Sequence, residues 1–389
     1  MRKNIFLLGM AVIATCLTSC NEDPEYFELP TYPDQMHIKA STDSIVFNKG
    51  KANETAITFS WDEAVSPISA TDSVTYRIAF YDTNQKADHI SDYIELGMAK
   101  QVSFTHDELN SIVARWVLPG QPLSVTAQLM AEVHNPQKYV RPIKSTVSFV
   151  ATCYEKYPTY MYMRIIDPAT GNLRTERMEQ PTLGTGIYAV TLDVTPCDFY
   201  FLTTTENYPA YGMAAGVPAQ PGVYKMEYFT SGDVTPFSTM ETGRRTIIID
   251  TNAEYNDYRM YLPLPSTMMP WMTGSATDYT DADNKNNWHT NEVAARFAQP
   301  DKLRNPYIYT WTGNLYKDGE FKIGLGSGWS DMFFFAPSDK ADPLQNQTLL
   351  PYRLQDAGGD LKWVPTASGN FTITLSLLIG DMWIKTVAN

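Results

Sequence analysis

An internal repeat constrains the fold of this chain more than any other feature of its sequence. Four short segments recur in the same order in a second copy, displaced by 121 to 126 residues. They pair residues 187–191 with 308–312, 199–202 with 321–324, 243–249 with 369–375, and 257–260 with 381–384. Their alternation and their β-branched and aromatic residues are typical of strands. Two such long copies indicate tandem β domains, which we place at residues 153–265 and 267–389.

The residues before the repeat predict a third β domain. Alternating segments at residues 55–61, 74–80 and 123–129, and a strand-like run at 145–150, follow one another at short spacing. This spacing favours a β-sandwich of the immunoglobulin or fibronectin type, which we place at residues 37–152.

The predicted fold class is therefore all-β, with an N-terminal immunoglobulin- or fibronectin-like sandwich followed by two tandem β-sandwich domains. Trp61 ends the first alternating segment and is expected to be the core tryptophan of the N-terminal sandwich. The one helical pattern lies at residues 105–109, where Thr105 can cap a single turn that carries Glu108 in a capping box.

The first 20 residues have the pattern of a bacterial lipoprotein signal peptide. Arg2 and Lys3 precede an apolar run at residues 5–13, which is too short to span a bilayer. Residues 17–20 (Leu-Thr-Ser-Cys) then fit a lipobox, with a large aliphatic residue, two small residues and a cysteine. We expect cleavage before Cys20 and acylation of that cysteine, which tethers the protein to a membrane. The alternative is an ordinary cleavage site that contains a cysteine by chance.

Residues 21–36 are expected to be a flexible tether. They begin with the acidic run Asn-Glu-Asp-Pro-Glu and contain Pro24, Pro30 and Pro33. Prolines at this density discourage both helix and strand, so the segment favours a solvated leash between the anchor and the first domain.

Charge and cysteine content limit the partners and the chemistry of the chain. It carries 43 acidic and 30 basic residues, a net charge of −13, which repels nucleic acid and argues against it as a partner.

Behind the signal peptide only Cys153 and Cys197 remain, and no C-x-x-C motif occurs. Two cysteines do not make a disulfide framework, although export leaves a bridge between them open.

The sequence shows no recognisable catalytic constellation. None of its five histidines pairs at i, i+4, and neither H-E-x-x-H nor G-x-S-x-G is present. Paired carboxylates for glycoside hydrolysis need only meet in space, so a hydrolase stays open as a less favoured alternative. We expect a protein that is not an enzyme and that uses no cofactor.

One acidic loop has the chemistry of a calcium ligand set. Asp278, Asp281 and Asp283 supply the oxygen atoms that calcium prefers. The loop lacks the glycine and the distal glutamate of an EF-hand, and a polar loop explains it equally well. We therefore assign no metal site.

The positive functional signal is aromatic. In the last domain Trp288, Trp329 and Trp363 stand beside glycine or polar residues, and Lys362 precedes Trp363. A flat ring on a loop covers the apolar face of a pyranose while polar neighbours bind its hydroxyls. We predict that these four residues form a glycan-binding platform. The alternative for each ring is that it folds back under its own loop and packs there.

Several motifs of the chain resemble those of SusE and SusF, the glycan-binding outer-membrane lipoproteins of Sus-type polysaccharide-utilisation systems. The resemblance rests on the lipobox with its acidic follow-on, on residues 104–110, and most specifically on residues 305–313, 319–322 and 328–337 of the last domain. The middle domain departs from the pattern, because Tyr208 stands near where Trp329 would align and the Gly-Asp-x-Lys-Trp segment at residues 359–363 has no counterpart there. The resemblance therefore implies a glycan site in the last domain and leaves one in the middle domain open.

The resemblance implies a spacer domain followed by tandem domains of the carbohydrate-binding type, in an outer-membrane protein exposed at the cell surface. It implies SusC-like and SusD-like outer-membrane proteins as partners and a polysaccharide or oligosaccharide, starch among them, as ligand. The expected function is non-catalytic capture of glycan for uptake by that transporter. A structural or adhesive surface lipoprotein without glycan binding is the alternative.

Overall fold

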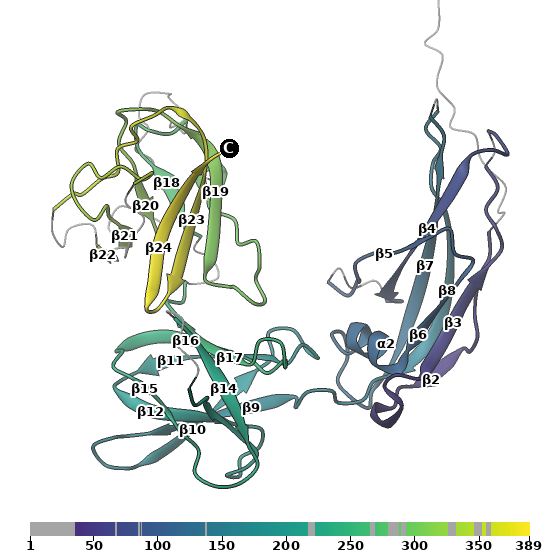
Figure 1. Ribbon diagram of the computed structural model, residues 1–389, viewed down its shortest axis with the longest axis horizontal. Coiled ribbons are helices and arrows are strands. Elements are labelled where there is room, and N and C mark those ends of the chain that lie inside the picture. Colours follow the sequence, from purple (N-terminus) through teal and green to yellow (C-terminus); the bar gives the residue numbers. More distant parts are fainter. Residues whose placement is uncertain are drawn as a thin grey trace, which may run out of the picture. The chain divides into compact units, whose positions relative to one another are not determined.

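The structure is a computed structural model in which the described residues are 36–66, 68–84, 86, 88–136, 138–216, 222–264, 269–278, 288, 293–325, 332–345, 352–354 and 359–389. Strands dominate these residues (Figure 1), and the predicted all-β class is confirmed. The signal peptide with Cys20 and the tether lie outside the described residues. Within the described part, no helix combines the length and the apolar character needed to cross a membrane.

The chain divides into two compact units. The first unit combines residues 36–45 with Asn53–His106 and Leu123–Ala151. The second unit combines Val46–Ala52, Asp107–Pro122 and Thr152–Asn389, and so holds both copies of the internal repeat.

The first unit is a sandwich of two sheets. Its strands in chain order are β1 (Ile38–Ala40), β2 (Ser44–Val46), β3 (Thr55–Trp61), β4 (Ser73–Asp82), β5 (Ile94–Gly97), β6 (Gln101–Thr105), β7 (Pro122–His134) and β8 (Ile143–Thr152). One sheet has the order β1-β3-β6 and the other the order β2-β8-β7-β4-β5. The predicted N-terminal sandwich is thus present.

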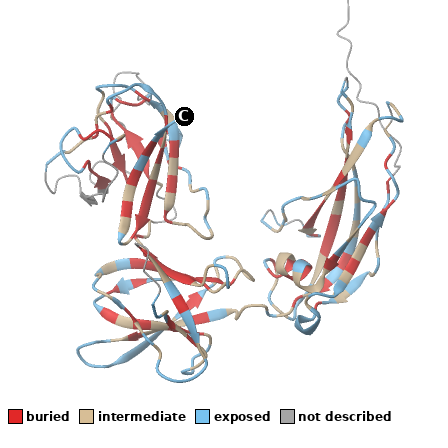
Figure 2. Ribbon diagram, in the orientation of Figure 1, coloured by how far each residue is buried: buried red, intermediate tan, exposed pale blue. Residues whose placement is uncertain are grey.

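Aromatic side chains fill the space between these two sheets. The ring of Phe59 on β3 lies 5.7 Å from that of Phe80 on β4 and 5.8 Å from that of Phe149 on β8. Trp61 is buried, as predicted, with its ring 5.5 Å from that of Tyr76. Figure 2 shows the result as strands on which buried and more exposed residues alternate, the period-2 pattern of a half-buried sheet.

The helical segment is longer than the single turn expected at residues 105–109. Helix α2 spans His106–Val113, and Leu109, Asn110 and Val113 are buried. Leu109 and Val113 lie four residues apart on one face, so packing extends the helix by a further turn. Asn110 is held by Tyr154, whose backbone N–H donates to its side-chain oxygen at 2.9 Å.

The first repeat of the second unit is a ring of strands. They are β9 (Tyr160–Ile166), β10 (Leu173–Glu179), β11 (Ile187–Val194), β12 (Cys197–Leu202), β13 (Ala210–Met213), β14 (Val223–Phe229), β15 (Phe237–Thr239), β16 (Gly243–Asp250) and β17 (Asp257–Tyr261). The order β14-β13-β12-β9-β10-β11-β16-β17 closes because β14 also pairs with β17. The two layers of the expected sandwich are therefore joined at their edges, although β10 and β11 share one residue pair, Glu179 with Ala189.

The second repeat contains β18 (Trp271–Thr273), β19 (Ile308–Leu315), β20 (Lys322–Gly324), β21 (Met332–Phe334), β22 (Tyr352–Leu354), β23 (Gly369–Leu378) and β24 (Asp381–Ala388). Its strands β19-β23-β24 repeat the arrangement β11-β16-β17. The ladders even end at matching places, with Val194 opposite Gly243 in one copy and Leu315 opposite Gly369 in the other.

The two repeats share one hydrogen-bonded sheet. Tyr261 at the end of β17 pairs with Leu378 at the end of β23, and the Leu262 N–H donates to the Leu377 carbonyl at 3.1 Å. The predicted boundary near residue 265 lies outside the described residues, so the division into two domains stays a prediction.

Both remaining cysteines are free thiols, so the bridge that was left open is not formed. Burial raises the pKa of Cys153 to about 12 and also raises the pKa of Cys197. A protonated, buried thiol is a poor nucleophile and a poor metal ligand, so neither cysteine is suited to nucleophilic catalysis or to metal binding.

Candidate functional site

Trp288 and Lys362 lie together, as the platform prediction requires. Lys362 Nζ is 5.4 Å from the centroid of the Trp288 ring, and Lys322 Nζ is 5.5 Å from it. Both distances allow attraction between the ammonium groups and the face of the half-buried ring.

Two carboxylates balance the two lysines. Asp360 accepts from Lys322 Nζ at 2.7 Å and lies 3.1 Å from Lys362 Nζ. Glu320 lies 3.2 Å from Lys362 Nζ. The arrangement has no net charge and offers both donors and acceptors beside an aromatic ring.

Lys322 is not among the site residues predicted from the sequence, and its side chain is 2% exposed. Its ammonium lies 5.1 Å from the centroid of the Phe333 ring and 5.6 Å from that of Phe335. A lysine between Phe321 and Ile323 on a short central strand is an unusual choice, because a buried charge needs a partner. That signal was present in the sequence, although the partner Asp360 could not be read from it.

The charges of this site are stable around neutral pH. Burial opposes ionisation of Asp360, but hydrogen bonds from Lys322 and Lys362 outweigh it and lower the pKa of the carboxyl group. Burial likewise opposes charge on Lys362, and hydrogen bonds to Asp360 and Glu320 overcome it and raise the pKa of the ammonium group. Fixed opposite charges suit hydrogen bonding to hydroxyl groups rather than proton transfer.

Trp363 does not belong to an exposed platform, and this part of the prediction is wrong. Its side chain is 0% exposed and stacks on Phe321, with ring centroids 5.4 Å apart and an interplanar angle of 20°. Its backbone pairs with Phe321 and Ala341. Neighbours on extended backbone point to opposite faces, so Lys362 reaches the site while Trp363 enters the core. The Gly-Asp-x-Lys-Trp segment suggested a loop because its pairing partners are distant in sequence.

The remaining candidates are Trp329 and the aspartates of the possible calcium loop. Trp329 lies outside the described residues, as do Asp281 and Asp283 of the calcium alternative. Asp278 accepts hydrogen bonds from Asn314, at 2.9 Å, and from Tyr316. Trp311, on β19, is buried. Among the described residues no group of three or more histidine, cysteine or acidic side chains is placed to hold a metal ion.

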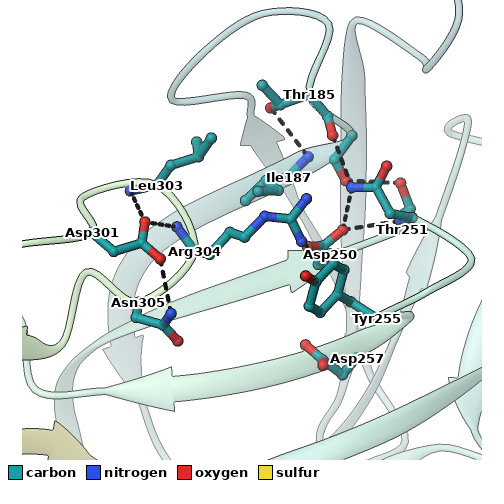
Figure 3. Close-up of polar contacts among 12 residues, drawn as sticks. Thr185, Ile187, Asp250, Thr251, Tyr255, Asp257, Asp301, Leu303, Arg304 and Asn305 are labelled. Atoms are coloured by element: carbon teal, nitrogen blue, oxygen red, sulfur yellow. Dashed lines mark hydrogen bonds and ion pairs between the residues drawn. The ribbon is translucent and has the colours of Figure 1, made fainter.

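A second polar cluster lies where the two repeats meet and is drawn in Figure 3. Arg304 Nη1 donates to Asp250 Oδ2 at 2.8 Å, and the guanidinium carbon lies 3.9 Å from the centroid of the Tyr255 ring. Asp301 accepts from the backbone N–H groups of Leu303, at 3.1 Å, and Arg304, at 2.9 Å. The cluster fixes the turn that carries Arg304.

Arg259 and Asp257 complete this cluster. Arg259 Nη2 lies 2.9 Å and 3.0 Å from the two carboxylate oxygens of Asp257, and Nη1 donates to the Arg304 carbonyl. The side chains of this pair are 8% and 4% exposed. The space that Asp250, Asp257, Arg259 and Arg304 enclose has no room for a water molecule. These groups bind one another and are structural.

Comparison with known proteins gives one family match. The model of the family described as SusE outer membrane protein matches residues 22–130. Among solved structures, the crystal structure of SusF from Bacteroides thetaiotaomicron is similar, with 12% sequence identity, a TM-score of 0.30, and coverage of 91% of this chain and 77% of that chain. No curated protein matches the sequence.

The family match lies in the N-terminal part of the chain, whereas the sequence motifs placed the most specific resemblance in the last domain. The description of the family agrees with the outer-membrane location that the sequence predicts. Over residues 22–130 the chain is therefore similar to the SusE outer membrane protein family, and the predicted resemblance is confirmed there.

Proposed function

We propose that this protein is a non-catalytic, surface-exposed lipoprotein of the outer membrane that binds a polysaccharide or oligosaccharide for uptake by a SusC/SusD-like transporter. The observation that carries the proposal is the Trp288 ring beside the charge-balanced group of Lys322, Lys362, Asp360 and Glu320. We place this site in the proposed domain 267–389 and regard the proposed domain 153–265 as its tandem neighbour.

The chemistry of a neutral sugar suits this group of residues. A pyranose presents an apolar C–H face to an aromatic ring and hydroxyl groups to charged side chains around it. Lys362 donates, and Asp360 and Glu320 accept, so a sugar hydroxyl can be satisfied in either role. The buried Lys322 holds Asp360 in place. Trp329 remains part of the proposed platform from the sequence, whereas Trp363 is removed from it.

Replacing Trp288 with alanine is expected to weaken glycan binding by roughly ten-fold. Loss of a few tens of Å² of stacking at about 25 cal/mol per Å² removes on the order of 1–2 kcal/mol, and about 1.4 kcal/mol corresponds to ten-fold. Isothermal titration calorimetry would measure this with the best ligand from a glycan array. The melting temperature should change little, because the ring is only half-buried.

Tyr139→Ala is a matched control for the Trp288 variant, because Tyr139 is an aromatic residue with 74% exposure in the first unit. Equal affinities for the two variants would contradict the site. Absence of binding to every glycan tested would favour the structural or adhesive alternative, and release of reducing sugar would reveal a hydrolase.

The lipid anchor has its own test. Replacing Cys20 with alanine removes the thiol that carries the acyl chains, so the protein should leave the membrane fraction. Fractionation and metabolic labelling with a radioactive fatty acid would measure this. Unchanged partitioning of Cys20→Ala into the membrane fraction would contradict the anchor.

A further inference from the structure

A cleft of about 600 Å³ lies between the two repeats of the second unit. One wall comes from β11, β16 and β17, and the other comes from residues 299–309. Clefts that bind small ligands have volumes of about 300–1,000 Å³. We infer that this cleft is a second saccharide site and that it selects sugars that carry a negative charge. The inference rests on the proposed function, because it assumes a glycan-binding protein.

The walls of the cleft have the mixed character that a sugar requires. Tyr261 is partly exposed and supplies an aromatic surface, and the hydroxyl of Tyr309 accepts from Gln299 Nε2 at 3.3 Å. The hydroxyl groups of Thr191 and Thr246 lie 2.7 Å apart on the neighbouring strands. An aromatic surface with hydroxyl and amide groups matches the apolar and polar sides of a pyranose.

The charge of the cleft distinguishes it from the Trp288 site. Lys302 and Arg244 line it, and its described lining residues include no carboxylate, although the chain has a net charge of −13. In the described part of the chain Lys302 makes no ion pair. Arg244 lies 3.5 Å from Asp193, with both side chains more than half exposed, so this pair is weak. A locally cationic cleft in an acidic protein favours an anionic ligand.

The cleft is also held in shape before any ligand arrives. The loop that carries Gln299, Lys302 and Pro306 is the one fixed by Asp301 and by the Arg304–Asp250 ion pair. Binding then requires little ordering of the loop. The ligand chemistry is a carboxylate or a sulfate ester on a sugar ring, as in uronic acid residues or sulfated galactose.

The test compares matched acidic and neutral saccharides. A galacturonan tetrasaccharide, its methyl ester and a κ-carrageenan oligosaccharide would be titrated into the chain that lacks its first 20 residues but retains every described residue. We expect the acid or the sulfated sugar to bind more tightly than the methyl ester, and more weakly as salt rises. The carboxylated and sulfated probes distinguish the two sources of charge.

Lys302→Gln should weaken binding of the preferred anionic sugar about three- to five-fold, and the double variant with Arg244→Gln should weaken it further. Lys385→Gln, at an exposed position on β24, is the matched control and should have no effect. Equal binding of the acid and its ester, or equal effects of the Lys302 and Lys385 variants, would overturn the inference.

The two proposals fail in different ways. If neutral glycans bind through Trp288 but anionic ones ignore Lys302, the cleft is not a site while the proposed function stands. If anionic sugars bind through Lys302 and the Trp288 variant has no effect on any glycan, the cleft stands and the Trp288 site fails. If no probe binds, both proposals fail.

Discussion

Trp363→Ala is expected to lower the free energy of unfolding of the second unit by about 3–5 kcal/mol, the usual cost of truncating a large buried aromatic residue. The ring is fully buried and stacks on Phe321 in a cluster that includes Trp311 and Phe371. Close packing prevents its neighbours from closing the cavity that truncation leaves. Urea denaturation followed by circular dichroism would measure the loss.

Trp363→Phe is the informative control. The indole Nε1 has no hydrogen-bond partner among the described residues, although it is buried. Phenylalanine keeps the stacked ring and removes this unsatisfied N–H group, so part of the cost should be recovered. If Trp363→Ala left stability unchanged and lowered glycan affinity instead, the ring would belong to the binding platform after all.

Arg259→Met is expected to destabilise the second unit by about 3 kcal/mol. The variant leaves the carboxylate of Asp257 buried, and among the described residues its remaining ion-pair partner is the half-exposed Lys225, whose Nζ lies 3.6 Å away. Removing one partner of a buried ion pair typically costs about 3–5 kcal/mol, because the other charge stays desolvated. It also removes the donor to the Arg304 carbonyl and so loosens the loop beside the cleft.

A double-mutant cycle separates the charge effect from packing. Arg259→Met combined with Asp257→Leu should lose less stability than Arg259→Met alone, because an apolar pair replaces the ion pair. Strict additivity of the two substitutions would show that the charges are not coupled. The expected readout is the midpoint of urea denaturation at constant slope.

Strands could be predicted from the sequence where a short segment contained both alternating apolar and polar residues and the turn residues that bound it. Residues 187–191 and 308–312 became β11 and β19. The period-2 pattern is clear at 308–312, where Tyr309 and Trp311 are buried between more exposed neighbours. In β11 the alternation begins only after Ile187 and Tyr188, which are both buried. The closure of β14 onto β17 could not be predicted, because hydrogen bonds between strands distant in sequence leave no local pattern.

In the candidate site, too, the contacts that decide where a side chain lies come from residues distant in sequence. Lys362 and Trp363 are adjacent, and their local context suggested one role for both. Pairing of Trp363 with Phe321 sends one side chain to the surface and the other into the core. Lys322 was missed because its importance comes from Asp360, 38 positions away.

Because β10 and β11 share a single residue pair, β10 bears on how closely packed copies of the protein interact with one another. Among the described residues, β10 pairs with β11 at Glu179 alone, so most of this edge of β10 is open there. Open strand edges pair readily with other chains. Arg174, Glu176, Arg177 and Glu179 occupy this edge, with ion pairs of 3.1 Å between the first two and 2.6 Å between the last two. An approaching strand would have to desolvate these charges. Neighbouring copies of the protein, even at high density on the cell surface, should therefore resist edge-to-edge pairing through this strand.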